Sequence, residues 1–327
     1  MIKKSLPLRK KVKVLVVGGG LSSEHEVSLK TSQMIVKNLD AAKYDAELVI
    51  IQKDGKWKFG KEKAVDIGAA ITKIACVKYD FAFIALHGVF GEDGRIQALF
   101  EWLGVPYGGA GVMASALAMD KQMTNVIYSA VGLRVPPYAV VEKKDGWRNK
   151  ISLPFVVKPV DGGSSVGVSI VKTKKELPTA LKKAFKECPR AMVQKYIKGT
   201  EITCGIIEDG EGYPFAFPPT EIVPQTAAFF DYHAKYAAGG SLEITPARIP
   251  EAQIREVQDL AVRAHLALGC RGMSRSDFIL SGGKFYILET NTIPGMTEAS
   301  LLPKAAAAAG IPFPELLDMI VRAGFRK

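Results

Sequence analysis

The chain has 327 residues, of which 48% are hydrophobic, enough to bury the cores of two or three domains. Its formal net charge of +11 fits either nucleic acid or an anionic small substrate, but no aromatic-interleaved basic stripe or zinc-finger spacing occurs, which argues against nucleic acid. No run approaches the ~18 apolar residues of a membrane helix, and the basic start lacks the apolar stretch of a signal peptide, so a soluble, cytoplasmic protein without membrane contact is expected.

The first part of the chain has the pattern of an α/β domain. Three apolar runs predict strands, at 13–17, 46–51 and 81–86. Helical spacing over 26–39 follows the glycines 18–20, and this alternation predicts a parallel sheet whose loops gather at the carboxyl ends of the strands. Ser23 stands where the third glycine of a dinucleotide fingerprint belongs, which argues against an NAD-dependent oxidoreductase.

Two further units follow this domain. A helical pattern over 113–131 ends at Gly132 and at Pro136-Pro137. The next segments predict a small α+β lobe, with strands at 155–158, 168–171 and 192–194 and a helix at 174–186. A third unit begins near residue 209, with a helix at 252–268 and strands at 275–280 and 285–291. We therefore expect three units, at residues 1–115, 116–208 and 209–327.

The segment from Lys158 to Gly167 has the chemistry of a phosphate-binding loop. Its glycines allow the backbone to approach a ligand closely, its N–H groups and hydroxyls can bind phosphate oxygens, and Lys158 adds a positive charge. The lysine precedes the glycines, which is the reverse of a Walker A loop, so a P-loop fold is disfavoured. A Gly/Ser-rich hairpin turn is the alternative for this segment taken alone.

Four polar side chains on two adjacent strands form the strongest candidate site. Residues two apart on a strand share a face, which pairs Arg275 with Asp277 and Glu289 with Asn291. All four converge if the hairpin has three loop residues, 282–284, whereas a two-residue loop would place the pairs on opposite faces. Facing carboxylates repel unless a cation offsets their charge, and oxygen ligands suit Mg²⁺ that bridges nucleotide phosphates. A salt-bridged sheet surface is the alternative.

Several segments together resemble the D-alanine–D-alanine ligases, in the family's order, from about residue 13 to the end. They are Ser23-Glu-His-Glu-Val-Ser28, Leu86-His-Gly88 with Gly91-Glu-Asp-Gly94, Ala116-Leu-Ala-Met-Asp-Lys121, Lys158 to Gly167, Asp231-Tyr-His-Ala-Lys-Tyr236, Arg275-Ser-Asp277 and Leu288-Glu-Thr-Asn-Thr-Ile-Pro-Gly295. The resemblance implies an α/β and α+β protein with a three-lobed ATP-grasp fold. Its N-terminal domain would be Rossmann-like, and ATP would lie between the central and C-terminal lobes.

The resemblance also implies the contacts of the nucleotide. The phosphates would be bound by Lys121 and Lys158, with Ser164 and Ser165 in the covering loop. The adenosine part would contact Gln194, Lys195 and Ile197 at the adenine and Glu201 at the ribose. Two Mg²⁺ ions, which Mn²⁺ is expected to replace, would be held by Asp277, Glu289 and Asn291.

Two D-alanine sites are implied in the same way. Glu24 would bind the ammonium group of the first D-alanine near His87, and Ser300 and Leu301 match positions near the carboxylate of the second. Tyr236, on a segment expected to close over the site, would contact Ser164 and Glu24. Arg275 and the backbone N–H of Gly295 are suited to stabilise an oxyanion.

The implied reaction is ATP-dependent joining of two D-alanine molecules through D-alanyl phosphate, for peptidoglycan precursors, by a homodimer. Because acylphosphates hydrolyse, residues 226–240 are expected to form a lid that excludes water. D-serine or D-lactate as the second substrate is an alternative, although Lys235-Tyr236 is typical of the dipeptide-forming type. A non-catalytic nucleotide-binding protein is a second alternative, against which the complete set of metal ligands argues.

Overall fold

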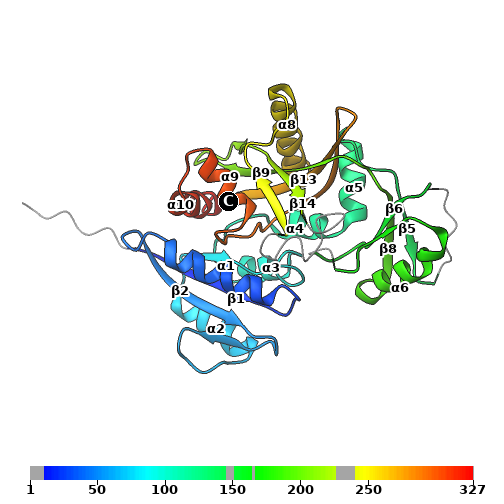
Figure 1. Ribbon diagram of the computed structural model, residues 1–327. Helices are drawn as coiled ribbons and strands as arrows, with labels where there is room; N and C mark the ends of the chain where they lie inside the picture. Colours follow the sequence, from blue (N-terminus) through cyan, green and yellow to red (C-terminus); the bar gives the residue numbers. More distant parts are fainter. Residues whose placement is uncertain (1–10, 145–150, 164–165, 226–239, 327) are drawn as a thin grey trace, which may run out of the picture.

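The computed structural model describes residues 11–144, 151–163, 166–225 and 240–326 (Figure 1). Within these ranges the strands form three sheets, and the expected combination of α/β and α+β architecture is present. The candidate residues Ser164, Ser165 and Tyr236 lie outside the described residues. In the part of the chain that is described, no helix is long and apolar enough to cross a membrane.

The N-terminal sheet has the order β3-β2-β1-β4. Its strands are β1 (Val12–Gly19), β2 (Tyr44–Ile51), β3 (Trp57–Phe59) and β4 (Phe81–Ile84). The accompanying helices are α1 (His25–Asn38), α2 (Ile67–Val77) and α3 (Arg95–Trp102). β1 is parallel to both β2 and β4, and its interior residues are fully buried, as the apolar runs of the sequence predict.

The second sheet is small and antiparallel, with the order β5-β8-β6-β7. Its strands are β5 (Tyr138–Glu142), β6 (Phe155–Pro159), β7 (Ser169–Val171) and β8 (Arg190–Lys195). A short 3-10 turn, η1 (Lys174–Glu176), leads into α6 (Leu177–Glu187), which packs its buried residues against this sheet. The α+β lobe that the sequence predicts in this region is therefore confirmed.

The third sheet has the order β12-β11-β9-β13-β14, with β10 paired to β9. Its strands are β9 (Thr200–Glu208), β10 (Pro214–Ala216), β11 (Thr220–Pro224), β12 (Ser241–Ile244), β13 (Met273–Ser281) and β14 (Lys284–Asn291). α8 (Glu251–Ala267) packs on the face that carries Ile202 and Ile206. α9 (Leu301–Ala308) and α10 (Phe313–Gly324) share a core with Ile207 on the other face.

The helical pattern over 113–131 is confirmed, but it is divided into two helices, α4 (Val112–Met119) and α5 (Lys121–Ala130). Asp120 adopts an extended conformation between them, with φ −83° and ψ 100°. Its carboxylate accepts hydrogen bonds from the backbone N–H groups of Gln122 and Met123, at 2.9 and 3.0 Å. An aspartate in this position is a good N-cap, so the chain ends one helix and starts another.

The helices α4 and α5 pack against the third sheet, since Ala114 and Tyr128 belong to the same core cluster as Ile202 and Val257. β9, which ends at Glu208 and so lies before the expected boundary of the third unit, is likewise a strand of the third sheet. The boundaries of the three expected units, at residues 115 and 208, stay predictions.

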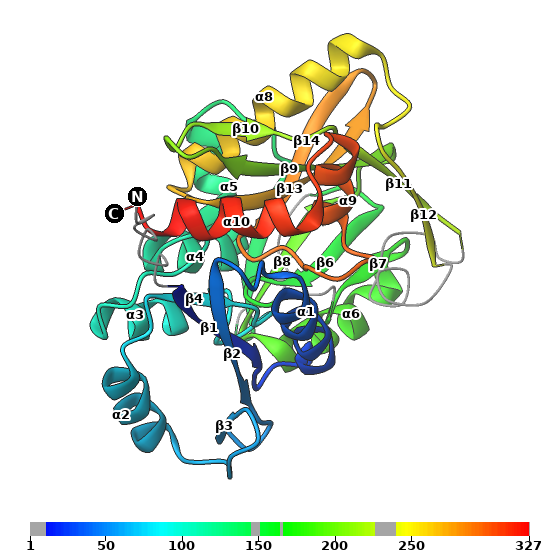
Figure 2. The ribbon, with the colours of Figure 1, turned by 90° about the vertical axis from the view of Figure 1, so that its left-hand side faces the viewer.

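The first and third units are joined through a shared core. Figure 2 shows α10 between the third sheet and the N-terminal unit, and Leu317 and Ile320 of this helix belong to the same buried cluster as Phe81 and Val16. At Gly324, an added Cβ would lie 2.4 Å from the backbone oxygen of Tyr107. The helix therefore approaches the N-terminal unit as closely as a glycine allows.

We expect Gly324→Ala to lower the free energy of unfolding by about 1–3 kcal/mol, because the added methyl group overpacks this interface. Thermal unfolding would measure the change. Gly210→Ala is the matched control, since an added Cβ there meets no described atom within 4 Å. Equal stability of the two variants would contradict the close packing of α10.

Candidate active site

Two adjacent cavities collect the candidate residues. The larger, of about 750 Å³, is lined by Glu24, Lys121, His87, Arg275, Glu289, Asn291, Gly295, Ser300 and Leu301. The smaller, of about 170 Å³, is lined by Lys121, Lys158, Gln194, Lys195, Ile197, Glu201, Asp277 and Glu289. Every candidate residue that the structure describes thus lines at least one cavity, and Lys121 and Glu289 line both.

The β13–β14 hairpin corrects one expectation and confirms another. Its turn has two residues, Gly282 and Gly283, because Ser281 pairs directly with Lys284; the expected three-residue loop is wrong. Both glycines have positive φ, 57° and 72°, which a two-residue hairpin turn of type I′ requires.

The expected pairing of the polar residues nevertheless occurs. Asp277 lies opposite Glu289 and Arg275 opposite Asn291, because the register shifts by one residue after Phe278 pairs with Ile287. Leu288 is the extra residue of this β-bulge. The bulge has the same effect on the pairing as a three-residue loop would have, and it brings all four side chains to one face.

Asp277 is held by two neighbours on this face. The guanidinium of Arg275 donates to both of its carboxylate oxygens, from Nε and Nη2, each at 3.0 Å. Thr203, which faces Asp277 from β9, donates its hydroxyl proton to Oδ1 at 2.6 Å. The salt bridge weighed as an alternative is therefore present, but it fixes Asp277 at the edge of a cavity and does not form a solvated surface pair.

The donor set fits Mg²⁺. Asp277 and Glu289 face each other across the strand pair, where directly opposite Cβ atoms are about 5 Å apart. Asn291 adds an amide oxygen, which accepts one hydrogen bond, from the N–H of Ile293 at 2.9 Å, and keeps a second lone pair. Across the described ranges of the chain, His, Cys, Asp and Glu nowhere form a group of three or more that could hold a metal, so the third ligand here has to be the amide of Asn291. Two carboxylates and an amide are the oxygen ligands that this ion prefers.

A chain of hydroxyl groups supports the hairpin from behind. Thr290 and Ser276 alternate with the site residues and point to the opposite face, where their hydroxyl oxygens lie 2.7 Å apart. The hydroxyl of Tyr128, on α5, lies 2.5 Å from that of Thr290. All three side chains are buried, so α5 is fixed to the strands that carry the candidate metal ligands.

Two lysines line the smaller cavity, and one of them, Lys121, also lines the larger one. Lys158, on β6, is only 8% exposed and lines the smaller cavity. Lys121, the first residue of α5, donates from Nζ to the carbonyl oxygen of Gly162 at 2.5 Å. Both positive charges therefore lie beside the start of the glycine-rich segment, as a phosphate site requires.

The smaller cavity also has an apolar part of its lining. Val156, Ile170, Ile279 and Leu288 form its walls, which suit a flat aromatic base. Gln194 is buried, and among the described residues its Nε2 has no hydrogen-bond partner. The ammonium of Lys195 donates to the hydroxyl oxygen of Ser152 at 3.0 Å and to the carbonyl oxygen of Leu153 at 3.2 Å.

Glu24, His87 and Glu92 form a cluster of ionisable groups in the larger cavity. The ring of His87 lies 3.4 Å from a carboxylate oxygen of Glu92 and 3.1 Å from the hydroxyl oxygen of Thr31. Burial disfavours the imidazolium, but the hydrogen bond and charge of Glu92, with the charge of Glu24, outweigh burial and raise the pKa of His87. Burial, reinforced by the charge of Glu24, raises the pKa of Glu92. The cluster therefore keeps a proton to higher pH than its separate groups would.

Glycines bring the backbone close to Glu24 of this cluster and to Ser300 in the larger cavity. At Gly88, whose φ is 70°, an added Cβ would lie 3.0 Å from an oxygen of Glu24. At Gly295 it would lie 2.8 Å from the hydroxyl oxygen of Ser300, which also accepts from the N–H of Thr297 at 2.9 Å. Gly295, Ser300 and Leu301 thus form one wall of the larger cavity.

Two site residues were missed in the sequence. Glu92 lies within the segment Gly91-Glu-Asp-Gly94, whose resemblance to the family could have marked it. Thr203 has no local signal, because its partner Asp277 is 74 residues away and only the sheet brings them together.

Comparison with known proteins identifies the family. The model described as "D-ala D-ala ligase N-terminus" matches residues 13–110, and "D-ala D-ala ligase C-terminus" matches residues 127–322. The chain belongs to the D-alanine–D-alanine ligase family. It is 44% identical to the D-alanine–D-alanine ligase of Pelotomaculum thermopropionicum, over 95% of this chain and 96% of the relative.

Solved structures of this family have the same fold. The D-alanine–D-alanine ligase from Bacillus anthracis, complexed with ATP, is 34% identical with a TM-score of 0.80, over 96% of this chain and 98% of that one. The VanG D-Ala:D-Ser ligase from Enterococcus faecalis is 30% identical with a TM-score of 0.84, over 95% of this chain and 99% of that one. The expected ATP-grasp fold is confirmed, while the roles of the individual site residues stay predictions.

We expect Glu92→Gln to lower the pKa of His87, because it removes the carboxylate that favours the imidazolium and leaves the effect of burial. Because the pKa of His87 is raised in the folded protein, its protonation stabilises the fold fully at a pH below the ordinary pKa of histidine. This contribution to stability is lost as the pH rises through the raised pKa. NMR titration of the histidine ring signals would measure the change. The buried His265 serves as the internal control, and Glu26→Gln as the matched variant. An unchanged His87 titration would contradict the assigned cause.

Proposed function

We propose that this chain joins two D-alanine molecules to D-alanyl-D-alanine, with ATP as the energy source and D-alanyl phosphate as the intermediate. One observation carries the proposal. A cavity suited to a nucleotide and a cavity suited to small zwitterions share a wall, and that wall contains Lys121 and Glu289. A phosphoryl group at this wall can be transferred from one cavity to the other.

The first step brings two anions together. The carboxylate of the first D-alanine attacks the γ-phosphorus of ATP, the bond to the bridging oxygen breaks, and ADP leaves. Lys121 and Lys158 offset the charge of the phosphates, and Glu24 binds the ammonium group of the substrate in the other cavity. Mg²⁺ held by Asp277, Glu289 and Asn291 would supply further neutralisation of phosphate charge.

The second step needs donors for an oxyanion. The amine of the second D-alanine attacks the acyl carbon of D-alanyl phosphate, and the carbonyl oxygen becomes negative. Arg275 and the N–H of Gly295 line the same cavity and are suited to stabilise that oxygen. The peptide bond remains after phosphate leaves and the amine loses a proton.

The resemblance to the family supports further features of this activity. They include the covering loop with Ser164 and Ser165, closure by Tyr236 and the 226–240 segment, the second Mg²⁺ ion with its replacement by Mn²⁺, the homodimer, the cytoplasmic location and the role in peptidoglycan precursors. D-alanine as the second substrate is favoured over D-serine because the curated relatives at about 40% identity are D-alanine–D-alanine ligases.

The activity can be tested directly. The protein would be incubated with ATP, Mg²⁺ and D-alanine, and phosphate release would be measured alongside the dipeptide by mass spectrometry. We expect equal amounts of phosphate and D-alanyl-D-alanine. D-serine and D-lactate as competitors would define the second site, and no amino-acid-dependent phosphate release would overturn the proposal.

We expect Glu289→Gln to lower kcat at least about 100-fold, because even residues that only support metal ligands cost 10–100-fold when they are changed. The variant should keep its fold, which a thermal unfolding curve like that of the unaltered protein would show. Nucleotide binding should depend less on Mg²⁺, as measured by titration with the metal. Glu298→Gln is the control, since Glu298 lines the larger cavity outside the proposed metal site. A near-normal rate in Glu289→Gln would refute the metal assignment.

A further inference from the structure

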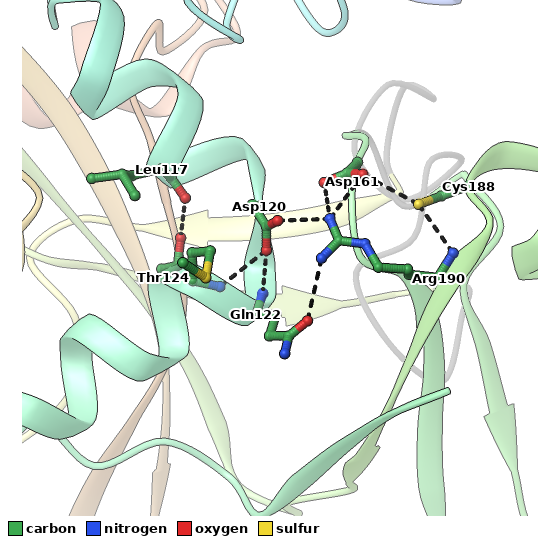
Figure 3. Close-up of polar contacts among 8 residues, drawn as sticks. Leu117, Asp120, Gln122, Thr124, Asp161, Cys188 and Arg190 are labelled. Atoms are coloured by element: carbon green, nitrogen blue, oxygen red, sulfur yellow. Dashed lines mark hydrogen bonds and ion pairs between the residues drawn. The ribbon is translucent and has the colours of Figure 1, made fainter. Parts of the chain in front are cut away.

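Arg190, the first residue of β8, connects two segments at the edge of the nucleotide cavity. Its Nη2 donates to Asp120 at 2.7 Å and to Asp161 at 3.4 Å, and its Nη1 donates to the side-chain oxygen of Gln122 at 3.3 Å. Figure 3 shows the guanidinium between the two carboxylates. Arg190 lines neither cavity, so in the described structure it can act on the site only through these neighbours.

The backbone reinforces this connection. The N–H of Val160 donates to the carbonyl oxygen of Arg190 at 3.0 Å, and the N–H of Lys121 donates to the carbonyl oxygen of Val160 at 3.1 Å. The end of β6, the start of β8 and the first residue of α5 therefore meet at one point. The guanidinium of Arg190 closes the same junction through side chains.

Each carboxylate at this junction controls a part of the phosphate site. Asp120 caps α5 and so fixes the direction in which Lys121 leaves the backbone. Asp161 lies within the glycine-rich segment 158–167 and directly precedes Gly162, whose carbonyl oxygen accepts from Lys121. Asp161 also accepts from the thiol of Cys188 at 3.3 Å, which fixes it from a second side.

We propose that Arg190 is a positioning residue for the nucleotide phosphates: it bridges Asp120 and Asp161 and thereby holds Lys121 against the start of the glycine-rich segment. This inference rests on the proposed function for the identity of the nucleotide. It assigns no contact between Arg190 and the substrate.

The chemistry of the junction favours arginine. Asp120 and Asp161 both approach the same nitrogen, so without a cation their charges repel each other close to the place where the phosphates bind. The hydrogen bond from Arg190 to Asp120 is the largest cause of the raised pKa of Arg190, which therefore stays charged. The planar fork can engage Gln122 and two carboxylates at once, whereas the single ammonium of a lysine cannot reproduce that geometry.

The three side chains of this junction are only partly buried, yet together they can fix the position of Lys121. The side chain of Asp120 is 18% exposed, that of Arg190 33% and that of Asp161 46%. A solvent-exposed ion pair contributes little to stability, but a partly buried network with several hydrogen bonds fixes geometry more firmly. The expected consequence of losing Arg190 is thus misplacement of Lys121, with a small effect on the stability of the whole protein.

The test compares ligands with and without phosphates. Dissociation constants for ATP and for adenosine would be measured without D-alanine, with Mg²⁺ present, for the unaltered protein, Arg190→Gln and Arg190→Lys. We expect Arg190→Gln to weaken ATP binding roughly 10-fold, the size of one lost charge-assisted contact, with adenosine binding within about 2-fold. Arg190→Lys should be intermediate, because it keeps the charge but loses the fork.

Kinetics supply the second measurement. We expect the KM for ATP to rise in Arg190→Gln while the KM for D-alanine stays within about 2-fold. Asp161→Asn should partly rescue Arg190→Gln, because it removes one of the two carboxylates left facing each other. Arg255→Gln, which breaks an ion pair with Glu251 on α8, is the matched control and should change neither constant.

Two outcomes would overturn the inference: unchanged ATP affinity in Arg190→Gln, or an equal loss of ATP and adenosine binding, which would indicate a general structural role. The proposed function fails separately, if the unaltered protein binds ATP but releases no phosphate with D-alanine. The binding comparison still decides the role of Arg190 in that case.

Discussion

The bulge at Leu288 is the constraint on which the site depends. A regular hairpin with the Gly282-Gly283 turn would pair Asp277 with Leu288 and send Glu289 to the opposite face. The extra residue restores the pairing at a small cost in regularity, and it is placed immediately before the first candidate ligand on β14. Bulges are common beside active sites because they redirect side chains without breaking the sheet. The hairpin can therefore keep a tight two-residue turn, because the bulge shifts the register next to the side chains that form the site.

The nucleotide cavity is shared between elements that belong to different sheets, so its geometry depends on what connects them. α5 has this role. At one end, Asp120 and the backbone of Lys121 join it to β6 and β8; further along, Tyr128 joins it through Thr290 to the hairpin. The position of Lys121 relative to Glu289 therefore depends on one short helix, α5. The hydroxyl groups behind the hairpin fix the distance between this helix and β14.

Much of the fold and most of the candidate site could be predicted from the sequence, because the information is local. The apolar run before Gly18 fits a buried parallel strand. The segments around Lys158 and Glu289 contain enough residues typical of the family for the resemblance to be recognised. Asp120 was also readable as a helix cap, although the continuous helical pattern on both sides concealed it.

The rest could not be predicted, because it depends on contacts between distant residues. Nothing near Leu288 distinguishes a bulge from a longer turn, since an apolar residue suits either. Arg190 lies 70 residues from Asp120, and the junction it forms exists only after two lobes have packed. Thr203 gives the same lesson, because a threonine within a strand is ordinary until the neighbouring strand is known.

The packing of α10 against the N-terminal unit also affects the order of folding. Phe81 and Val16 share a core with Leu317 and Ile320, which the ribosome adds far later. The N-terminal strands can pair early, but they cannot cover that part of their apolar surface until the last helix has been made. Until α10 has been made, this apolar surface is exposed to other chains, so the protein is open to aggregation before its active site is complete.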